Sequence, residues 1–141
     1  MENTNEMTII FDSRPTNEAL ARVAVASFCT QLNPTLEEVS DLKTAVSEAV
    51  TNCIIHGYEG EVHKIQVDCR LSGQELTVDV IDHGVGIADI QKAMEPMFTT
   101  DKTGTRSGMG FSFMEAFMDQ VHVESEPGKG TKVVMRKQIG R

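Results

Sequence analysis

The sequence lacks the features that mark several large classes of protein. It has 13 basic residues against 21 acidic ones and a net charge of −8, so it has no basic excess of the kind that proteins binding nucleic-acid phosphates normally show. No stretch approaches the roughly 18 consecutive apolar residues that a membrane span needs, and the first residues do not read as a signal peptide. We therefore expect a cytoplasmic protein that has no direct contact with nucleic acid or membrane.

Residues that bind metals are also few. The three cysteines are odd in number, widely separated and flanked by apolar residues, which predicts buried, reduced thiols at Cys29, Cys53 and Cys69. The four histidines show no paired spacing. We expect exposed positions for His63, His83 and His122. His56 either bonds carbonyls at a helix end or lines a pocket.

Length and periodicity predict a single domain, residues 1–141, of the α+β class. The expected strands are 7–12, 65–71, 76–81, 121–126 and 131–137. The expected helices are one that is capped by Thr16 or Asn17 and stopped by Asn33-Pro34, one from 36 to about 56, a short one at 90–94, and one at 110–119. A loop is expected over 95–107. This order favours a two-layer sandwich, a mostly antiparallel sheet with helices on one face.

The second helix carries the first chemical motif. Thr35 and Glu38 form a capping box at its start, and Gly57 is expected to end it. Glu48 and Asn52 lie one turn apart, off the apolar stripe. A carboxamide oxygen can hold Mg²⁺, and a carboxylate beside it could accept a proton. The alternative is a solvated Glu48 and an Asn52 that bonds a nearby turn.

Two glycine motifs follow. Asp82 ends a strand and precedes Gly84 and Gly86. A buried carboxylate there needs a donor, such as the exocyclic amine of adenine, and the glycines would let a base or ribose approach the backbone. The alternative is an Asp82 that bonds its own turn.

Gly108 and Gly110 come directly before the apolar helix 110–119. Loop amides and the helix dipole would form an anion site there, with charge added by Lys102 and Arg106. The alternative is an ordinary glycine-rich helix start. The pattern G-x-x-x-x-G-K-[ST] is absent from the sequence, which excludes a P-loop.

Taken together, the three motifs resemble those of the GHKL ATPase superfamily. Glu48-x-x-x-Asn52 is similar to its N-box, Asp82-x-Gly84-x-Gly86 to its first G-box, and Gly108-x-Gly110 to its second. Within the superfamily, segments 17–32, 47–58, 97–100 and 106–111 most resemble the bacterial anti-sigma factor serine/threonine kinases of sporulation.

This resemblance implies a function. Such a protein binds and inhibits a sporulation sigma factor as a homodimer. It also uses Mg²⁺ and ATP to phosphorylate a serine of an anti-anti-sigma factor protein, and it leaves ADP. By resemblance, Glu48 is the catalytic base, Asn52 holds Mg²⁺, and Arg22 and Thr51 contact partners. The nucleotide-binding residues implied are Asn52, His56, Asp82, Gly84, Gly86, Ile87, Thr99, Thr100, Arg106, Ser107, Gly108, Met109, Gly110 and Thr131.

Three other interpretations are weighed against this one. A histidine kinase catalytic domain would need a dimerisation helix pair, which we do not expect ahead of Met7. An ATPase of the gyrase kind would need a transducer domain. A nucleotide-binding scaffold that only sequesters a sigma factor would not require a base at Glu48.

Overall fold

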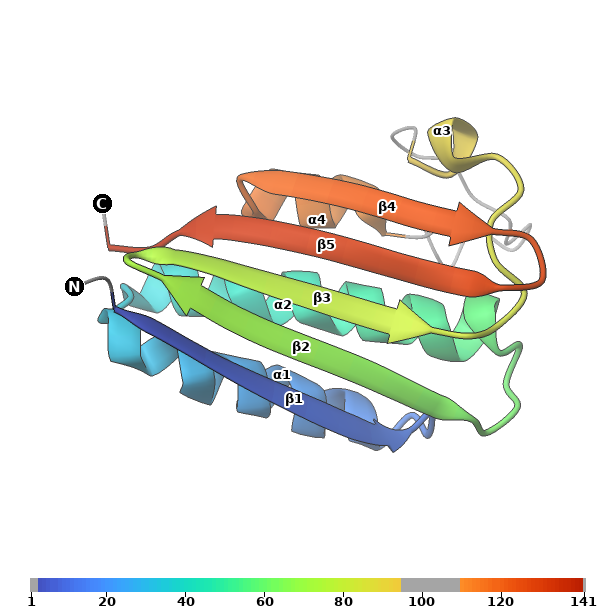
Figure 1. The fold of residues 1–141 in the computed structure, drawn as a ribbon, viewed down its shortest axis with the longest axis horizontal. Helices are drawn as coiled ribbons and strands as arrows, with labels where there is room; N and C mark the ends of the chain where they lie inside the picture. The colour runs from blue at the N-terminus through green and yellow to red at the C-terminus, as the bar shows by residue number, and fades with distance from the viewer. Residues whose placement is uncertain (1–2, 95–109, 141) are drawn as a thin grey trace.

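The computed structural model describes residues 3–94 and 110–140, which form a five-stranded sheet with helices behind it (Figure 1). The strands are β1 (Thr4–Asp12), β2 (Lys64–Ser72), β3 (Glu75–Asp82), β4 (Gln120–Glu126) and β5 (Gly130–Gln138). They lie in the order β1-β2-β3-β5-β4, and every neighbouring pair is antiparallel. The predicted α+β class and sheet type are confirmed.

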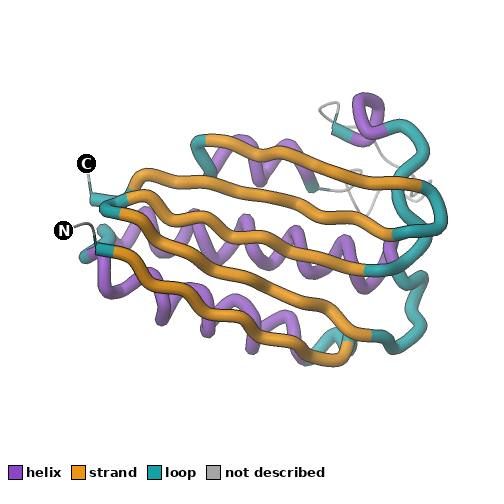
Figure 2. The backbone as a smooth tube through the Cα atoms, viewed as in Figure 1, coloured by secondary structure: helices purple, strands orange, loops and turns teal. Residues whose placement is uncertain are grey.

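The helices α1, α2 and α4 cover one face of this sheet (Figure 2). The helical elements are α1 (Asn17–Cys29), η1 (Thr30–Leu32), α2 (Leu36–Asn52), η2 (Cys53–Gly57), α3 (Ile90–Ala93) and α4 (Phe111–Phe117). Of these, η1 is a 3₁₀ turn and η2 is a π-helical turn that continues α2. No helix in the described ranges has the length and apolarity needed to cross a bilayer.

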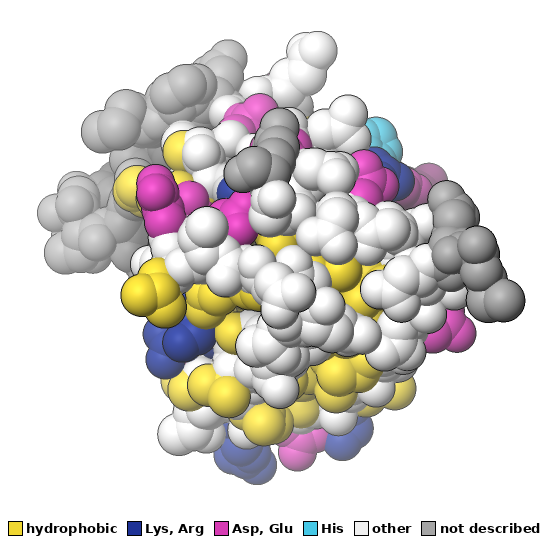
Figure 3. All heavy atoms as spheres, turned by 90° about the vertical axis from the view of Figure 1, so that its left-hand side faces the viewer, with side chains coloured by type: hydrophobic (Ala, Val, Ile, Leu, Met, Phe, Trp, Pro, Cys, Tyr) yellow, Lys and Arg dark blue, Asp and Glu magenta, His cyan; other side chains and the backbone are white. Residues whose placement is uncertain are grey.

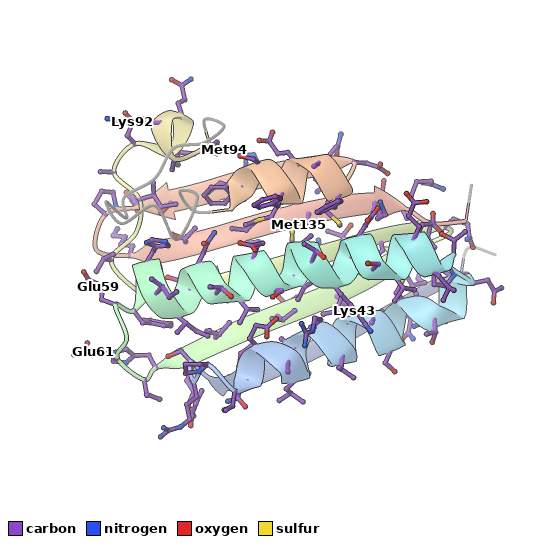
Figure 4. The ribbon with its side chains drawn as sticks, turned by 180° about the vertical axis from the view of Figure 1, so that it is seen from behind. Lys43, Glu59, Glu61, Lys92, Met94 and Met135 are labelled. Atoms are coloured by element: carbon purple, nitrogen blue, oxygen red, sulfur yellow. The ribbon has the colours of Figure 1, made fainter. Side chains whose placement is uncertain are left out.

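The core lies between the sheet and the helices because alternate strand residues point to opposite faces. On β3, Leu76, Val78 and Val80 are fully buried on the helix side. Val46 of α2 meets this layer, and Met135 of β5 lies between α2 and α4 when the molecule is seen from behind (Figure 4). This packing fixes α2, and with it the residues near its C-terminal end, against β3 and β5.

The start of α2 confirms the capping box. The Thr35 side chain accepts a hydrogen bond from the Glu38 amide at 3.0 Å, and the Glu38 carboxylate accepts one from the Thr35 amide at 2.9 Å. The same carboxylate also accepts the Gly140 amide at 3.0 Å. Glu38 therefore joins the start of α2 to the C-terminal end of the described chain.

The structure corrects the prediction for α1. Thr16 is its N-cap residue but makes no side-chain capping bond, and Asn17 donates its side-chain amide to the Asp12 carbonyl instead. Leu20 and Val23, two apolar residues of this helix, are 54% and 57% exposed. The face that meets the sheet and α2 carries Ala21 and Val25, so the apolar pattern of α1 is wider than its buried face.

The end of the second helix also differs from the prediction. The α-helix ends at Asn52, and the Tyr58 amide donates to the Cys53 carbonyl at 2.8 Å, an i→i−5 bond. Tyr58, and not Gly57, is therefore the capping residue. A π-helical turn places one more residue in the loop of each hydrogen bond, and such turns occur often at functional sites.

The predicted loop 95–107 lies outside the described residues.

Candidate functional site

A cavity of about 320 Å³ lies between the end of α2, η2, the end of β3 and the start of β5. Its apolar wall is formed by Ala49, Ile87, Phe111 and Val133. A mostly apolar cavity with a few polar groups is typical of sites that bind small organic ligands.

Four polar residues predicted from sequence line this one cavity. They are Asn52 and His56 on the helical side, Asp82 at the end of β3, and Thr131 on β5. Asp82 and Thr131 are direct partners in the β3–β5 register, which explains why residues 49 positions apart meet. Gly86 and Ile87, for which nucleotide binding was expected, also line the cavity.

Asp82 is the buried acid of this cavity, with 4% of its surface exposed. Its Oδ1 accepts the Gly84 amide at 2.9 Å. Burial raises the pKa of the Asp82 carboxyl, and the nearby Gly84 amide, Cys53 thiol and Thr131 amide oppose the rise. Within the described ranges the cavity has no lysine or arginine in its lining, so dipoles from amides and a thiol support this carboxylate.

Cys53 is confirmed as a buried free thiol, but it does more than fill the core. It lines the same cavity as Asp82. Burial, together with the Asp82 charge, raises the pKa of the Cys53 thiol well above its ordinary value. The sulfur is therefore protonated at neutral pH and able to donate.

The glycines of the D-x-G-x-G turn are required by close backbone contacts. A β-carbon on Gly84 would fall 2.0 Å from the Gly57 carbonyl oxygen, and one on Gly86 would fall 2.1 Å from that of Glu126. The Val85 amide donates to the same Gly57 carbonyl at 2.9 Å. Among the described residues, it is thus the protein's own backbone, at Gly57 and Glu126, that comes close to Gly84 and Gly86. Gly84 lines a separate, neighbouring depression.

Glu48 lies one turn before Asn52, and its carboxylate contacts Gly110, the N-cap residue of α4. Gly110 has a φ of +69°, and a β-carbon there would fall 2.3 Å from Glu48 Oε2. The sequence placed these two residues in separate motifs, and the packing of α4 on α2 joins them. Glu48 is half-buried, so its side chain packs against neighbouring residues and is still accessible to water.

The predicted partner-binding residues lie apart from the cavity lining. Arg22 on α1 forms an ion pair with Glu18 at 3.6 Å, and Glu18 also accepts a hydrogen bond from the Ser47 hydroxyl on α2. Thr51 lies half-buried on α2. Six predicted nucleotide-binding residues lie outside the described ranges: Thr99, Thr100, Arg106, Ser107, Gly108 and Met109.

Ser125 is a supporting residue that the sequence motifs did not reveal. Its hydroxyl accepts the Ile87 amide at 2.7 Å and lies 2.8 Å from Thr131 Oγ1 and 2.9 Å from the Gly130 carbonyl. It thus connects two segments of the cavity wall. Alternation along β4 could have revealed it, because Ser125 shares the inward face with Val121 and Val123.

Tyr58, the single tyrosine, is a second such residue. Its hydroxyl accepts the His83 amide at 2.8 Å and donates to the Lys64 carbonyl, so it connects the end of η2 to the residue after Asp82.

His63, His83 and His122 are exposed, as predicted. No group of three or more metal-binding histidine, cysteine or acidic side chains occurs within residues 3–94 and 110–140.

Comparisons with known proteins agree with this geometry. Residues 11–137 match the family described as the histidine kinase-like ATPase domain. The chain is 56% identical over 140 residues to the anti-sigma F factor of a Thermoanaerobacter species, covering 99% of this chain and 98% of that protein. It is 53% identical over 135 residues to the anti-sigma F factor of Clostridium acetobutylicum, covering 96% and 94%.

Among solved structures, the fold is similar to that of the RsbU and RsbW domains of a Mycobacterium tuberculosis protein. The TM-score is 0.70 at 21% identity, over 97% of this chain and 32% of that one. The family match spans β2, β3 and β4, the last two residues of β1, all but the last residue of β5, and the helices α1, α2 and α4. It therefore includes every described residue that lines the cavity. The chain belongs to the histidine kinase-like ATPase domain family.

Proposed function

We propose that the protein is an anti-sigma factor and a protein serine/threonine kinase. It would bind and inhibit a sporulation sigma factor, and would use Mg²⁺ and ATP to phosphorylate a serine of an anti-anti-sigma factor protein. The observation that carries the proposal is the grouping of Glu48, Asn52 and Asp82 around one end of α2. The full-length identity to proteins named anti-sigma F factor supports it.

The cavity would hold the adenine of the nucleotide. Asp82 is a buried acceptor without a cation beside it in the described lining, and a ligand amine would supply the donor that a buried carboxylate needs. Ile87, Phe111 and Val133 offer apolar contacts to the faces of a base. Thr131 lies opposite Asp82 and would contact the same edge of the ring.

Asn52 would hold Mg²⁺ through its carboxamide oxygen. The donor set fits this ion, because Asn52 is 9% exposed, lines the cavity and has a carboxylate one turn earlier. When bound, Mg²⁺ would neutralise charge on the phosphates. A single protein oxygen with the remaining positions filled by phosphate and water is a common arrangement for this ion.

Glu48 would act as the general base. Its carboxylate would accept the proton of the substrate serine hydroxyl while the serine oxygen bonds to the γ-phosphorus and the bond to the ADP oxygen breaks. Contact with Gly110 holds the carboxylate at the start of α4. His56, Gly84 and Gly110 would complete the nucleotide site. Phosphate contacts are proposed for Thr99, Thr100, Arg106, Ser107, Gly108 and Met109.

Arg22 and Thr51 would contact the protein partners. Leu20 and Val23 are exposed beside Arg22 on α1. Figure 3 shows the molecule from the end that carries the termini, and apolar side chains are visible there in the lower half, where α1 and β1 lie. Apolar residues around an arginine are typical of protein interfaces. Resemblance to the anti-sigma kinases further supports a homodimer, a single domain and a cytoplasmic location.

The test is a phosphoryl-transfer assay with labelled ATP, Mg²⁺ and candidate anti-anti-sigma proteins, followed by detection of phosphoserine. Labelled phosphoserine on one candidate, absent when Mg²⁺ is chelated, is the expected result. A sigma-factor pull-down is run in parallel. Sigma capture without any phosphoserine would instead indicate the non-catalytic sequestering scaffold and contradict the kinase assignment.

A further inference from the structure

Gly57 is one of two glycines in the described ranges whose backbone conformation does not call for glycine. Its φ, like that of Gly84, is not positive, whereas the other seven described glycines have φ values from +60° to +101°. Gly57 is the last residue of η2, and glycine in a helical turn is less favourable than alanine. The reason for a glycine at this position therefore lies in its contacts.

A β-carbon at Gly57 would meet three atoms of the Asp82 carboxylate at once. It would fall 2.9 Å from Oδ2, 3.0 Å from Oδ1 and 3.0 Å from Cγ. The carboxylate is confined, because Asp82 is 4% exposed and its Oδ1 accepts the Gly84 amide at 2.9 Å. The backbone of Gly57 is held as well, because its carbonyl accepts the Val85 amide at 2.9 Å. The end of η2 and the D-x-G-x-G turn thus meet without room for a methyl group.

We propose that Gly57 is a positioning residue for base recognition: the absence of a side chain there leaves the Asp82 carboxylate in the orientation that accepts the exocyclic amine of adenine. This inference rests on the proposed nucleotide site. Gly57 and Asp82 line the same cavity, so a methyl group at position 57 would displace the carboxylate within it. A hydrogen bond weakens steeply as its angle departs from linearity. The effect of a substitution at Gly57 should therefore appear with ligands that carry the amine and be absent with ligands that lack it.

The experiment uses the full-length protein and two ligands, ADP and the purine riboside diphosphate that has hydrogen in place of the 6-amino group. Calorimetry measures both affinities for wild type, Gly57→Ala, Asp82→Ala and the double variant. Gly73→Ala is the control for backbone effects. Gly73 lies in the turn between β2 and β3 with a φ of +60° and does not line the cavity. Beyond its chain neighbours, no described atom lies within 4 Å of its β-carbon position.

In Gly57→Ala we expect the ADP affinity to fall about 10- to 100-fold, the range for a lost hydrogen bond to a charged group, with the affinity for the amine-free ligand within about twofold of wild type. Asp82→Ala should lose most of the wild-type preference for ADP. Adding Gly57→Ala to Asp82→Ala should change neither affinity by more than about twofold, because the carboxylate that the methyl group displaces is gone. Gly73→Ala should lower the melting temperature and leave the ratio of the two affinities at its wild-type value.

Equal losses for both ligands in Gly57→Ala, or an unchanged affinity ratio, would overturn the inference and show that a methyl group there only obstructs the cavity. If Gly57→Ala does not fold, restored folding of the double variant is the supporting result, and a double variant that also fails to fold would overturn the inference. Wild-type protein that binds both ligands equally would contradict base recognition by Asp82 itself, and with it the proposed nucleotide site.

Discussion

The carboxylate of Glu48 lies so close to Gly110 that any β-carbon at that position would fall 2.3 Å from Oε2. Glu48 belongs to α2 and Gly110 begins α4, so the proposed base and the second glycine motif form one unit. Gly110 also has a φ of +69°, which other residues adopt only with strain.

Replacing Gly110 should therefore affect chemistry more than stability. In Gly110→Ala the new methyl group displaces the Glu48 carboxylate, and a displacement of about 1 Å can cost about 10²-fold in rate. Gly128→Ala is the control, because Gly128 has a φ of +81° but no atom within 4 Å of its β-carbon position. Both variants should lose about 1–2 kcal/mol of stability, and only Gly110→Ala should lose phosphoryl transfer. Equal transfer rates would contradict the role of this contact.

Glu48→Gln should separate binding from chemistry. The amide has the same shape but cannot accept the serine proton, a contribution typically worth about 10²–10⁴-fold in rate. ATP affinity, measured by calorimetry, should stay near the wild-type value because Glu48 does not line the cavity. A variant that phosphorylates at the wild-type rate would show that Glu48 is not the base.

Asp82→Asn should weaken ATP binding by about 1–3 kcal/mol, because an amide group can face the adenine amine with a donor of its own. For the same reason wild-type protein should bind GTP poorly, since guanine has an oxygen where adenine has the amine. Competition of ATP and GTP against a fluorescent nucleotide measures both effects. Equal affinity of wild type for ATP and GTP would remove Asp82 from base recognition.

Arg22→Ala should affect partners and leave the nucleotide unaffected. Arg22 lies on α1 and pairs with Glu18, outside the residues that line the cavity. Interface arginines often contribute strongly, so capture of the sigma factor, phosphorylation of the anti-anti-sigma protein, or both should weaken by about 2 kcal/mol or more. Calorimetry with ATP and pull-downs with each partner measure the two surfaces separately. Lost ATP affinity with unchanged partner binding would place Arg22 in the nucleotide site.

Glu38 should give the protein a stability component that depends on pH. Hydrogen bonds from the Thr35 and Gly140 amides lower the pKa of Glu38 below its ordinary value of 4.5. Because the folded-state pKa is the lower one, this stability is present above about pH 4.5 and is lost as pH falls through the folded-state value. Glu38→Gln should therefore melt below wild type at pH 7, and the difference should shrink in acid. A difference that stays constant from pH 7 to pH 3 would contradict this linkage.

Local patterns in the sequence were enough for much of the fold. Alternation predicted all five strands, and the capping box placed the start of α2 because both partners lie within three residues of each other. The one-turn spacing of Glu48 and Asn52, and the strand-end position of Asp82, are likewise local, and the motifs indicated these candidate residues directly. The apolar residues of α1 extend beyond its buried face, as the exposed Leu20 and Val23 show, so the local pattern alone does not define that face.

Only the tertiary structure decided which distant residues meet. The β3–β5 register pairs Asp82 with Thr131, the packing of α4 on α2 sets Gly110 against Glu48, and the π-helical turn η2 brings Gly57 to the Asp82 carboxylate. Each contact joins segments that no short-range period connects, because it depends on how whole elements pack. The sequence by itself therefore determined the element types and the chemistry available, and the packing of the layers determined how that chemistry is assembled.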